Sequence, residues 1–257
     1  MSSATNPFQA FSLEGRRALV TGASSGLGQH FAITLASAGA EVFVAARRLD
    51  KLEACVQRIE QSGGKATAIV MDVCDRQSVA SALQEIAAPH ILLNNAGVTH
   101  TARALEIDDA DWNAVLDTDL KGAWIVAQET ARRMAASGEG GSIINVTSIL
   151  ASRVAGGVAA YCAAKAALAQ LTRVLALEWA RHEIRVNSLA PGYIATDLNR
   201  DFLASEAGDR LRQRIPSRRF GTPGDLDGAL LLLASSAGAH MTGSEIVVDG
   251  GHLCSSL

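Results

Sequence analysis

The chain has 257 residues, of which 48% are hydrophobic and 19% are charged, and its formal net charge is −3. This length and composition allow a large buried core and suit one α/β domain, so we expect residues 1–257 to form a single domain. A net charge this close to zero offers no broad basic surface for nucleic acid or for an anionic membrane, and neither partner is expected.

The cysteines and the N-terminus bear on compartment and on metal binding. Four cysteines are scattered without a CxxC pair or a histidine at zinc-finger spacing, which argues against a metal cluster or a disulfide framework. The first residues lack a basic region followed by an apolar run, and no window approaches the about 20 apolar residues of a membrane span. We therefore expect a cytoplasmic protein with no membrane segment and no metal site.

Short apolar runs alternate with longer helical segments along the chain, which is the pattern of successive βαβ units. The pattern predicts seven strands, over residues 18–21, 41–46, 66–71, 91–94, 142–146, 185–190 and 245–248. It predicts helices over residues 27–38, 49–61, 77–87, 109–137, 158–182 and 225–235. The expected fold is a Rossmann-like, doubly wound parallel sheet of seven strands in a three-layer αβα arrangement.

The first predicted strand runs directly into a glycine-rich turn, TGASSGLG at residues 21–28, and a predicted helix follows. Glycines permit a tight turn, and the helix N-terminus presents free N–H groups to a pyrophosphate. The spacing is GxxxGxG, which differs from the commoner GxGxxG of dinucleotide sites. We expect this turn to bind a dinucleotide cofactor through Gly22, Ser24, Ser25, Gly26, Leu27 and Gly28.

The second predicted strand ends at Arg47 and Arg48, where enzymes that use NAD usually place an acid for the ribose 2′-hydroxyl. A guanidinium group can instead bind the 2′-phosphate of NADP in bidentate geometry. We therefore expect NADP(H), with Arg47 as the preferred contact and Arg48 as the second. Use of NAD(H), with both arginines on a solvated edge, is the alternative.

Tyr161 and Lys165 are spaced by four residues on a predicted helix, so they share one face. An ammonium group beside a phenol favours the deprotonated phenol. Such a pair suits reversible proton transfer to a carbonyl oxygen. The alternative is an ordinary exposed pair, and the surrounding motifs decide between the two.

Residues 195–222 interrupt the alternation of strands and helices with a polar, helix-forming stretch. Long excursions in compact domains commonly act as lids, and in parallel sheets they gather at the carboxyl ends of strands. We expect this segment to cover the substrate. The arginines in its second half either attract an anionic substrate or form a solvated face: Arg210, Arg212, Arg214, Arg218 and Arg219.

In the order and spacing of its motifs, the chain resembles the short-chain dehydrogenase/reductase family over nearly its whole length. The motifs are the glycine-rich turn, the NNAG sequence at 94–97, Ser148 after the fifth predicted strand, Tyr161 with Lys165, the PGYIAT sequence at 191–196 and the VDGG sequence at 248–251. The resemblance implies that Ser148 hydrogen-bonds the substrate oxygen and that Tyr161 transfers the proton. It also implies that Lys165 acts on Tyr161 and binds the nicotinamide ribose.

The resemblance further implies cofactor contacts outside the glycine-rich turn. These residues are Asp72, Val73, Asn95, Ala96, Gly97, Tyr161, Lys165, Pro191, Gly192, Ile194 and Thr196. Purely structural roles are open for the NNAG residues, which can brace the central sheet, and for Asp72, which can cap a strand end.

Asp119 departs from the family pattern, because the family usually has asparagine at this fourth catalytic position. In the family, that residue acts through its main-chain carbonyl, which holds a water in contact with the lysine. An aspartate keeps the carbonyl and brings a carboxylate toward Lys165, where the charge either weakens the effect of the lysine on Tyr161 or is solvated. We expect activity to be retained.

The expected activity is interconversion of a secondary alcohol and a ketone with NADP(H), with Tyr161 as general acid and base. The substrate is a small carbonyl or alcohol, either a 3-oxoacyl thioester or a polyol or sugar acid. A nucleotide-binding sensor without catalysis is the alternative, because a fold does not fix a function. The helices at 109–137 and 158–182 are apolar on more than one face, so we expect a homotetramer or homodimer.

Overall fold

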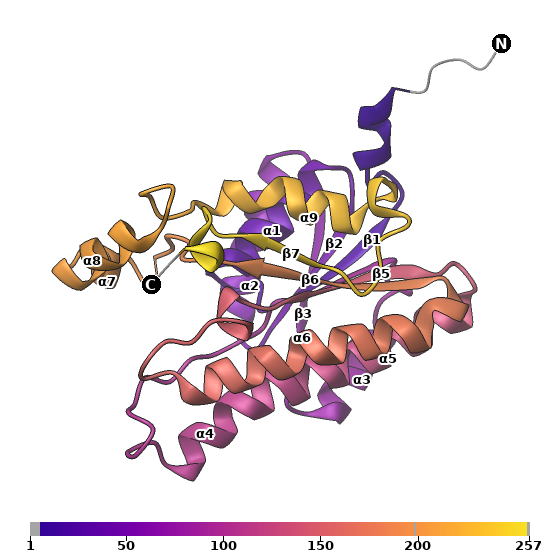
Figure 1. The fold of residues 1–257 in the computed structure, drawn as a ribbon. Coiled ribbons are helices and arrows are strands. Elements are labelled where there is room, and N and C mark those ends of the chain that lie inside the picture. Colours follow the sequence, from indigo (N-terminus) through magenta and orange to yellow (C-terminus); the bar gives the residue numbers. More distant parts are fainter. Residues whose placement is uncertain (1–5, 198, 256–257) are drawn as a thin grey trace.

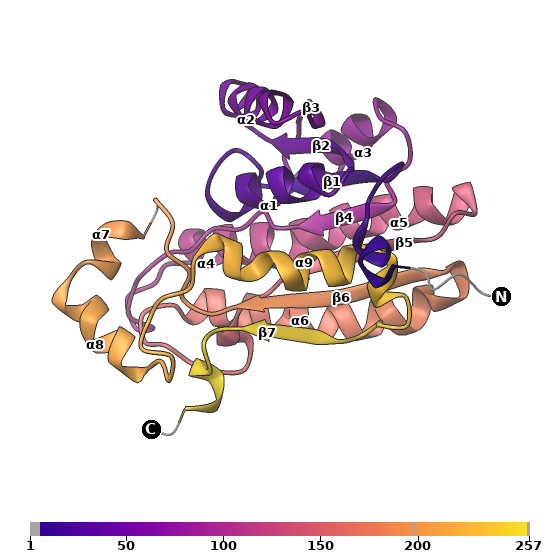
Figure 2. The same cartoon turned by 90° about the horizontal axis from the view of Figure 1, so that it is seen from above.

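Seven parallel strands form one sheet in the computed structural model, which describes residues 6–197 and 199–255. The strand order is β3-β2-β1-β4-β5-β6-β7, so the direction of winding reverses between β1 and β4 (Figure 2). The predicted seven-stranded, doubly wound parallel fold is confirmed. The strands are β1 (Arg17–Thr21), β2 (Glu41–Ala46), β3 (Lys65–Val70), β4 (Ile91–Asn94), β5 (Gly141–Val146), β6 (Ile184–Pro191) and β7 (Glu245–Val248).

Helices cover both faces of this sheet (Figure 1). On one face the buried core joins the sheet to α1, α2 and α9, and on the other face it joins the sheet to α3, α5 and α6. The helices are α1 (Gly26–Ser37), α2 (Leu49–Gln61), α3 (Arg76–Gln84), α4 (Asp109–Leu116), α5 (Ala123–Ser137), α6 (Ala159–Trp179), α7 (Arg200–Leu203), α8 (Glu206–Arg214) and α9 (Asp227–Ala234).

The two cores follow from the alternation of side chains along each strand. In β1, Val20 lies in the core with Phe31 of α1, whereas its neighbour Leu19 lies in the opposite core with Val126 of α5. Strands that are buried on both faces need continuous apolar runs, which is why the sequence shows runs instead of alternation here. Full burial of a side chain such as Phe31 contributes about 1.5–3 kcal/mol.

The segment predicted as one helix over 109–137 contains an interruption. A π-helix, Asp117–Gly122, lies between α4 and α5, so the prediction of one uninterrupted α-helix is wrong at its centre. Gly122 packs closely there, because a Cβ on it would lie 2.9 Å from Cγ2 of Val73 and 3.0 Å from the carbonyl oxygen of Asp117. This irregularity sets the direction in which Asp119 points.

Helix α3 is shorter than the predicted 77–87 and ends at Gln84. Its terminal carbonyl groups are satisfied from α5, where the Arg133 guanidinium donates to the carbonyl of Leu83 and, at 2.7 Å, to that of Ile86. A charged side chain from a distant helix therefore binds carbonyl groups at and just after the end of α3, and local sequence does not encode that contact.

The carboxyl ends of the strands lie at one edge of the sheet, and α7 and α8 lie beyond the same edge (Figures 1 and 2). These two short helices lie within the predicted 195–222 excursion, of which residue 198 lies outside the described residues, as do residues 1–5 and 256–257. No helix in the described ranges has the length and apolar character needed to cross a membrane.

Candidate active site

The glycine-rich turn joins β1 to α1 and leaves the start of that helix open. Gly22 and Gly26 adopt positive φ angles of 68° and 56°, which glycine tolerates without strain. The N-cap residue Ser25 makes no side-chain capping bond, and the first turn of α1 contains no acidic residue. The N–H groups and the positive dipole end of α1 therefore face an anion site.

A network around Thr21 holds this turn against the NNAG segment. The Thr21 hydroxyl accepts from the backbone N–H groups of Asn95 and Ala96 at 3.0 and 3.1 Å, and Asn95 Nδ2 donates to the Thr21 carbonyl at 3.1 Å. A Cβ on Gly28 would lie 2.3 Å from the Gly22 carbonyl oxygen and 2.4 Å from Asn95 Nδ2. Sequence reasoning missed Thr21, although a hydroxyl at the end of the first strand was a usable signal.

Asn94 braces the sheet. Its Nδ2 donates to the Ala123 carbonyl at 2.8 Å and to Oδ1 of Asn145 at 3.1 Å, joining β4 to α5 and to β5. These bonds agree with the alternative that residues of the NNAG turn brace the central sheet.

The two arginines after β2 are exposed, and one of them reaches the glycine-rich turn. Arg48 Nη2 donates to Oγ of Ser24 at 3.2 Å, while Arg47 lies next to it at the end of the strand. A guanidinium group is thereby held beside the turn, where a 2′-phosphate can meet it.

Asp72 and Val73 follow β3, and each makes contacts within the protein. Oδ1 of Asp72 accepts from the backbone N–H of Cys74 at 2.9 Å, which is the predicted alternative of a strand-end cap. Val73 is buried against Gly122. The half-buried Asp72 still lies at the carboxyl end of the sheet.

Ser148 follows β5 and caps the 3-10 helix Ile149–Ala151. Its Oγ accepts from the backbone N–H of Leu150 at 3.1 Å, and the residue is 8% exposed. The hydroxyl proton is not used in that bond and is available to a substrate oxygen.

Tyr161 and Lys165 lie in the first two turns of α6, with Lys165 Nζ 5.4 Å from the centre of the Tyr161 ring. Lys165 is only 4% exposed, and its Nζ donates to the carbonyl of Val146 at 3.0 Å. The alternative of an ordinary exposed pair is therefore wrong.

Asp119 is fully buried in contact with Lys165, so the alternative of a solvated carboxylate is also wrong. Oδ2 lies 3.1 Å from Lys165 Nζ, and Oδ1 accepts from the backbone N–H of Val98 at 2.7 Å. Oδ2 makes no hydrogen bond of good geometry with the described residues, so its contact with Lys165 is an ion pair more than an aligned hydrogen bond.

Burial and charge act in opposite directions on this pair. Burial raises the pKa of Asp119, although the Lys165 ammonium group and the Val98 N–H both lower it in part. Burial alone lowers the pKa of Lys165, but the oxygens of Tyr161 and Asp119 outweigh that effect, and the net direction for the lysine pKa is upward. The ammonium form of Lys165 is therefore favoured in this site.

The segment after β6 packs closely on the C-terminal turn. Pro191 is the last residue of β6, and a Cβ on Gly192 would lie 2.6 Å from Cβ of Asp249. Ile194 is buried and forms a bridge with Gly221 at the far end of the excursion.

Thr196 lies at the start of the excursion in a turn closed by Asn199. The backbone N–H of Thr196 donates to Oδ1 of Asn199 at 2.9 Å, and Asn199 Nδ2 donates to the carbonyl of Ile194 at 2.9 Å.

The C-terminal 3-10 helix His252–Cys254 is tied to the segment that follows Ser148. Arg153 donates to the carbonyl of His252 and, at 2.8 Å, to Oγ of Ser255. The His252 ring lies 5.7 Å from the ring of Tyr193, and burial raises the pKa of that phenol. Sequence could not pair these residues, because the segments are about a hundred positions apart.

Three of the five arginines in the excursion pair with nearby carboxylates. The distances are 2.6 Å for Arg210–Glu206, 2.8 Å for Arg212–Asp209 and 2.7 Å for Arg219–Asp225. These exposed pairs favour the solvated helix face over an anion site. Within the described ranges, no group of three or more His, Cys, Asp or Glu side chains is arranged to hold a metal ion.

Comparisons with known proteins agree with this geometry. Residues 22–252 match the family model described as Enoyl-(Acyl carrier protein) reductase. The chain is 37% identical to 2-dehydro-3-deoxy-D-gluconate 5-dehydrogenase of Dickeya dadantii (strain 3937), over 95% of this chain and 97% of that protein. It is 38% identical to gluconate 5-dehydrogenase of Gluconobacter oxydans (strain 621H), over 94% of this chain and 96% of that protein.

The same relationship appears among solved structures. A gluconate 5-dehydrogenase from Burkholderia cenocepacia J2315, crystallised with NADP and tartrate, superposes with a TM-score of 0.94 at 37% identity, covering 98% of this chain and 100% of that chain. Fold and relatives therefore agree, and the chain belongs to the short-chain dehydrogenase/reductase family of oxidoreductases.

Proposed function

We propose that the protein is an NADP(H)-dependent dehydrogenase that interconverts a secondary alcohol and a ketone of a sugar acid. The observation that carries the proposal is the buried Lys165 ammonium group beside Tyr161, on the helix that follows Ser148. The names of the relatives support the sugar-acid class, because the two reported proteins and the superposed structure are gluconate or dehydro-deoxy-gluconate 5-dehydrogenases.

A bound nicotinamide would supply or accept the hydride, and residues of the protein transfer the proton and stabilise the charge on the substrate oxygen. Negative charge develops on the substrate oxygen as a ketone is reduced. The free hydroxyl proton of Ser148 and the Tyr161 phenol stabilise that charge more strongly in the transition state than in the ground state. Tyr161 then donates its proton, and in the oxidation direction the phenolate accepts the proton of the alcohol.

The protein groups fit NADP(H). The open N-terminus of α1 and the turn from Gly22 to Gly28 suit the pyrophosphate, and Arg48, held beside Ser24, suits the 2′-phosphate together with Arg47. Further proposed contacts follow the other strands: Asp72 and Val73 at the adenine; Asn95, Ala96 and Gly97; Tyr161 and Lys165 at the ribose; and Pro191, Gly192, Ile194 and Thr196 at the nicotinamide. The excursion at 195–222 is the proposed cover for the substrate.

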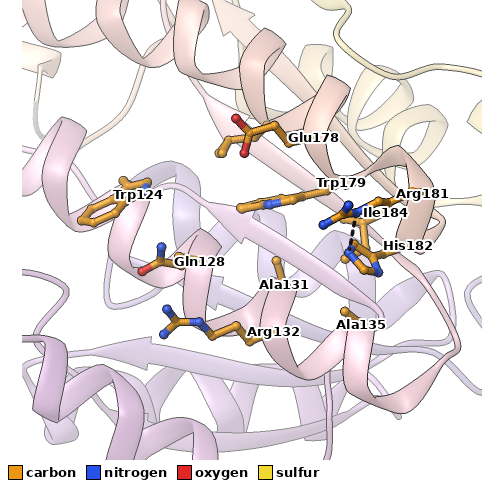
Figure 3. A pocket seen from close by; sticks show the side chains of 11 residues that line it. Trp124, Gln128, Ala131, Arg132, Ala135, Glu178, Trp179, Arg181, His182 and Ile184 are labelled. Atoms are coloured by element: carbon orange, nitrogen blue, oxygen red, sulfur yellow. Dashed lines mark hydrogen bonds between the residues drawn. The ribbon is translucent and has the colours of Figure 1, made fainter.

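We further propose that the protein is a homotetramer that associates through α5 and α6. A pocket between these helices is lined by Trp124, Gln128, Arg132, Trp179 and neighbouring residues (Figure 3). On the same helix α6, Leu177 is 82% exposed and Val174 is 41% exposed. Large apolar side chains exposed beside a pocket are typical of protein–protein contacts.

The activity is tested by following nicotinamide absorbance with NADPH or NADH and a panel of ketones and alcohols. The panel contains gluconate, other sugar acids, polyols and 3-oxoacyl thioesters. We expect turnover of a sugar acid and a preference for the phosphorylated cofactor. Turnover of the thioesters alone would replace the proposed substrate class.

Tyr161→Phe separates an enzyme from a nucleotide-binding sensor. Removing the phenolic hydroxyl removes the general acid and base, so we expect kcat to fall by about 10²- to 10⁴-fold. NADPH binding should weaken far less than that, because the contacts of the glycine-rich turn and of the two arginines are kept. Ser152→Ala, which alters a hydroxyl near the 3-10 helix that follows Ser148, is the comparison variant for general effects of losing a hydroxyl. Tight NADPH binding without turnover of any carbonyl by the wild type would favour the sensor.

A further inference from the structure

We propose that Asp119 is a positioning residue that acts through Lys165. Its ionised carboxylate holds the lysine ammonium group and offsets part of its charge, so Tyr161 exchanges its proton at a higher pH than it would with asparagine at position 119. This inference rests on the proposed function, and it assigns a role to the side chain of Asp119 instead of its main-chain carbonyl.

The carboxylate is fixed on both sides. The backbone N–H of Val98 donates to Oδ1 at 2.7 Å, and Lys165 Nζ lies 3.1 Å from Oδ2. Gly97 packs against Oδ2 of Asp119, and a Cβ on this glycine would lie only 2.9 Å from that oxygen. Asp119 therefore cannot turn away from Lys165 without displacing the turn at 97–98.

The surroundings favour the ionised carboxylate over the neutral acid. A protonated carboxyl group needs an acceptor for its proton, and both groups that approach Asp119, the Val98 N–H and the Lys165 ammonium, are donors. Neither oxygen accepts from a solvated group, because the residue is 0% exposed. An ion pair that neutralises both buried charges satisfies these constraints.

Several charged groups on the neighbouring elements have partners of their own. From α6, Tyr161 and Lys165 face the carboxylate, and β5 contributes only the Val146 carbonyl to the lysine. Other titratable groups on adjoining segments include Asp111 of α4, which pairs with His100; Glu129 of α5, which pairs with Arg76 and Arg132; Asp117, which pairs with Lys121; and Cys74, which contacts Thr118. Tyr193 interacts electrostatically with Tyr161 and with Cys162 of α6. Among the carboxylates of the described residues, Asp119 is thus the one that acts on Lys165.

Donor counting indicates what the carboxylate changes. An ammonium group has three N–H donors. In this site one goes to the Val146 carbonyl, and Asp119 lies 3.1 Å from the nitrogen as an ion-pair partner, so donors remain for the cofactor ribose. A cation within about 4–6 Å of a phenol favours the phenolate form. When the Asp119 carboxylate offsets part of the Lys165 charge, the lysine therefore stabilises the Tyr161 phenolate less.

The test compares Asp119→Asn with Asp117→Asn. Asparagine at 119 keeps the size and the Oδ1 acceptor for Val98 but removes the charge. Asp117 lies on the same π-helix and is exposed, with Lys121 at 3.3 Å, so the identical substitution there is a matched control.

We expect the pH–rate profiles of alcohol oxidation and of ketone reduction to move down by about one pH unit in Asp119→Asn. That shift makes oxidation about tenfold faster on the acidic limb. Asp117→Asn should retain the wild-type midpoints, because an exposed charge is screened.

A spectroscopic measurement gives the same answer without turnover. The chain contains two tyrosines, Tyr161 and Tyr193, so tyrosinate absorbance in a Tyr193→Phe background follows Tyr161 alone. We expect the phenol transition to move to lower pH when Asp119→Asn is added, by the same amount as the rate profile. If Asp119→Asn does not fold, Asp119→Ser removes the charge with a smaller side chain and tests the same expectation.

The outcomes separate this inference from the proposed function. Coincident tyrosinate curves and coincident rate profiles for wild type and Asp119→Asn would overturn the inference while leaving the enzyme intact. A downward tyrosinate shift in a protein that turns over no carbonyl would support the inference and reject the proposed activity. An upward shift would also overturn the inference.

Discussion

At the scale of single residues, the guanidinium of Arg48 has the most direct bearing on cofactor choice. It is exposed but anchored by Ser24 at 3.2 Å, within the turn that is expected to hold the pyrophosphate. A pre-oriented guanidinium loses less side-chain freedom when it binds a phosphate. Arg47 has no such anchor in the glycine-rich turn, so the structure favours Arg48 at least as strongly as Arg47.

We predict that Arg48→Ala and Arg47→Ala each weaken binding of NADPH and leave binding of NADH nearly unchanged. A hydrogen bond to a charged group contributes about 1.5–3 kcal/mol, which corresponds to about a 10- to 100-fold loss of NADPH affinity. Fluorescence titration with both nucleotides measures the ratio. Arg58→Ala is the matched control, because Arg58 is on the following helix and its guanidinium bonds Gln29 at 2.8 Å. Equal losses for NADPH and NADH would argue against contact with a 2′-phosphate.

The positions of the candidate site residues along the fold were easier to predict from sequence than their contacts. The glycine-rich turn, Ser148, Tyr161 and Lys165 have spacings that local structure fixes, so their positions could be predicted. The burial of Asp119 could not, because the π-helix that orients it has no recognisable sequence pattern. The contact between Arg153 and the carbonyl of His252 depends on how two distant segments meet, and no local rule specifies that.

At the scale of elements, the imidazole ring of His90 joins the amino ends of β1 and β4. The backbone N–H of Arg17 donates to His90 Nδ1 at 3.0 Å, so His90 is neutral with its proton on Nε2. That nitrogen lies 2.9 Å from Glu139 Oε2, in the loop before β5. Protonation of Nδ1 would remove the acceptor that β1 uses.

We predict that the folded protein loses stability in mild acid partly through His90. Burial lowers the pKa of His90, so the folded state binds the proton less readily than the unfolded chain, whose histidines titrate near about 6.5. The contribution of His90 is therefore present above that pH and lost as the pH falls toward the folded pKa. Burial also lowers the pKa of His252, so this residue adds a second loss of stability as the pH falls.

The measurement is the free energy of unfolding by urea at several pH values on both sides of the unfolded histidine pKa. His90→Gln should have a smaller pH dependence than the wild type, whereas His240→Gln, at an exposed position, should not change it. Parallel curves for wild type and His90→Gln would show that the imidazole does not contribute to the acid sensitivity.

The element boundaries show where prediction from sequence ends. Strands β2, β4 and β7 have the predicted bounds, because each is a short apolar run between clear turn signals. Helix α3 ends early because Arg133 of α5 satisfies its last carbonyl groups, and the segment at 109–137 is divided by a π-helix. Both differences come from contacts between elements.

At the scale of the whole molecule, the exposed apolar face of α6 is the feature that a single copy of the chain leaves uncovered. Leu177 is 82% exposed, and burial of such a side chain contributes about 1.5–3 kcal/mol. The pocket between α5 and α6, with Trp124 and Trp179 in its wall, lies toward the C-terminal end of α6 and away from Tyr161 in its first turn (Figure 3). Association there would leave the substrate edge of the sheet open.

We predict that Leu177→Glu weakens the oligomer, because a carboxylate at the centre of an apolar contact loses its hydration without a partner. Light scattering during gel filtration at micromolar concentration measures the mass. Leu105→Glu is the control, because Leu105 is 101% exposed in the segment before α4, outside the α5–α6 surface. A monomeric wild type would reject the proposed tetramer, and dissociation by the control alone would place the contact elsewhere.

The reversal of strand order between β1 and β4 has a consequence for how the chain folds. The bond between Thr21 and Asn95 closes a loop of 74 residues, and the bond between Lys165 and Val146 requires that β5 and α6 are already in place. Contacts of such long sequence separation form slowly, and partly folded chains of this size have incomplete tertiary packing. The cofactor cradle and the proton-transfer group are thus completed only after both halves of the sheet have joined, so we expect nucleotide binding to require both halves to be folded.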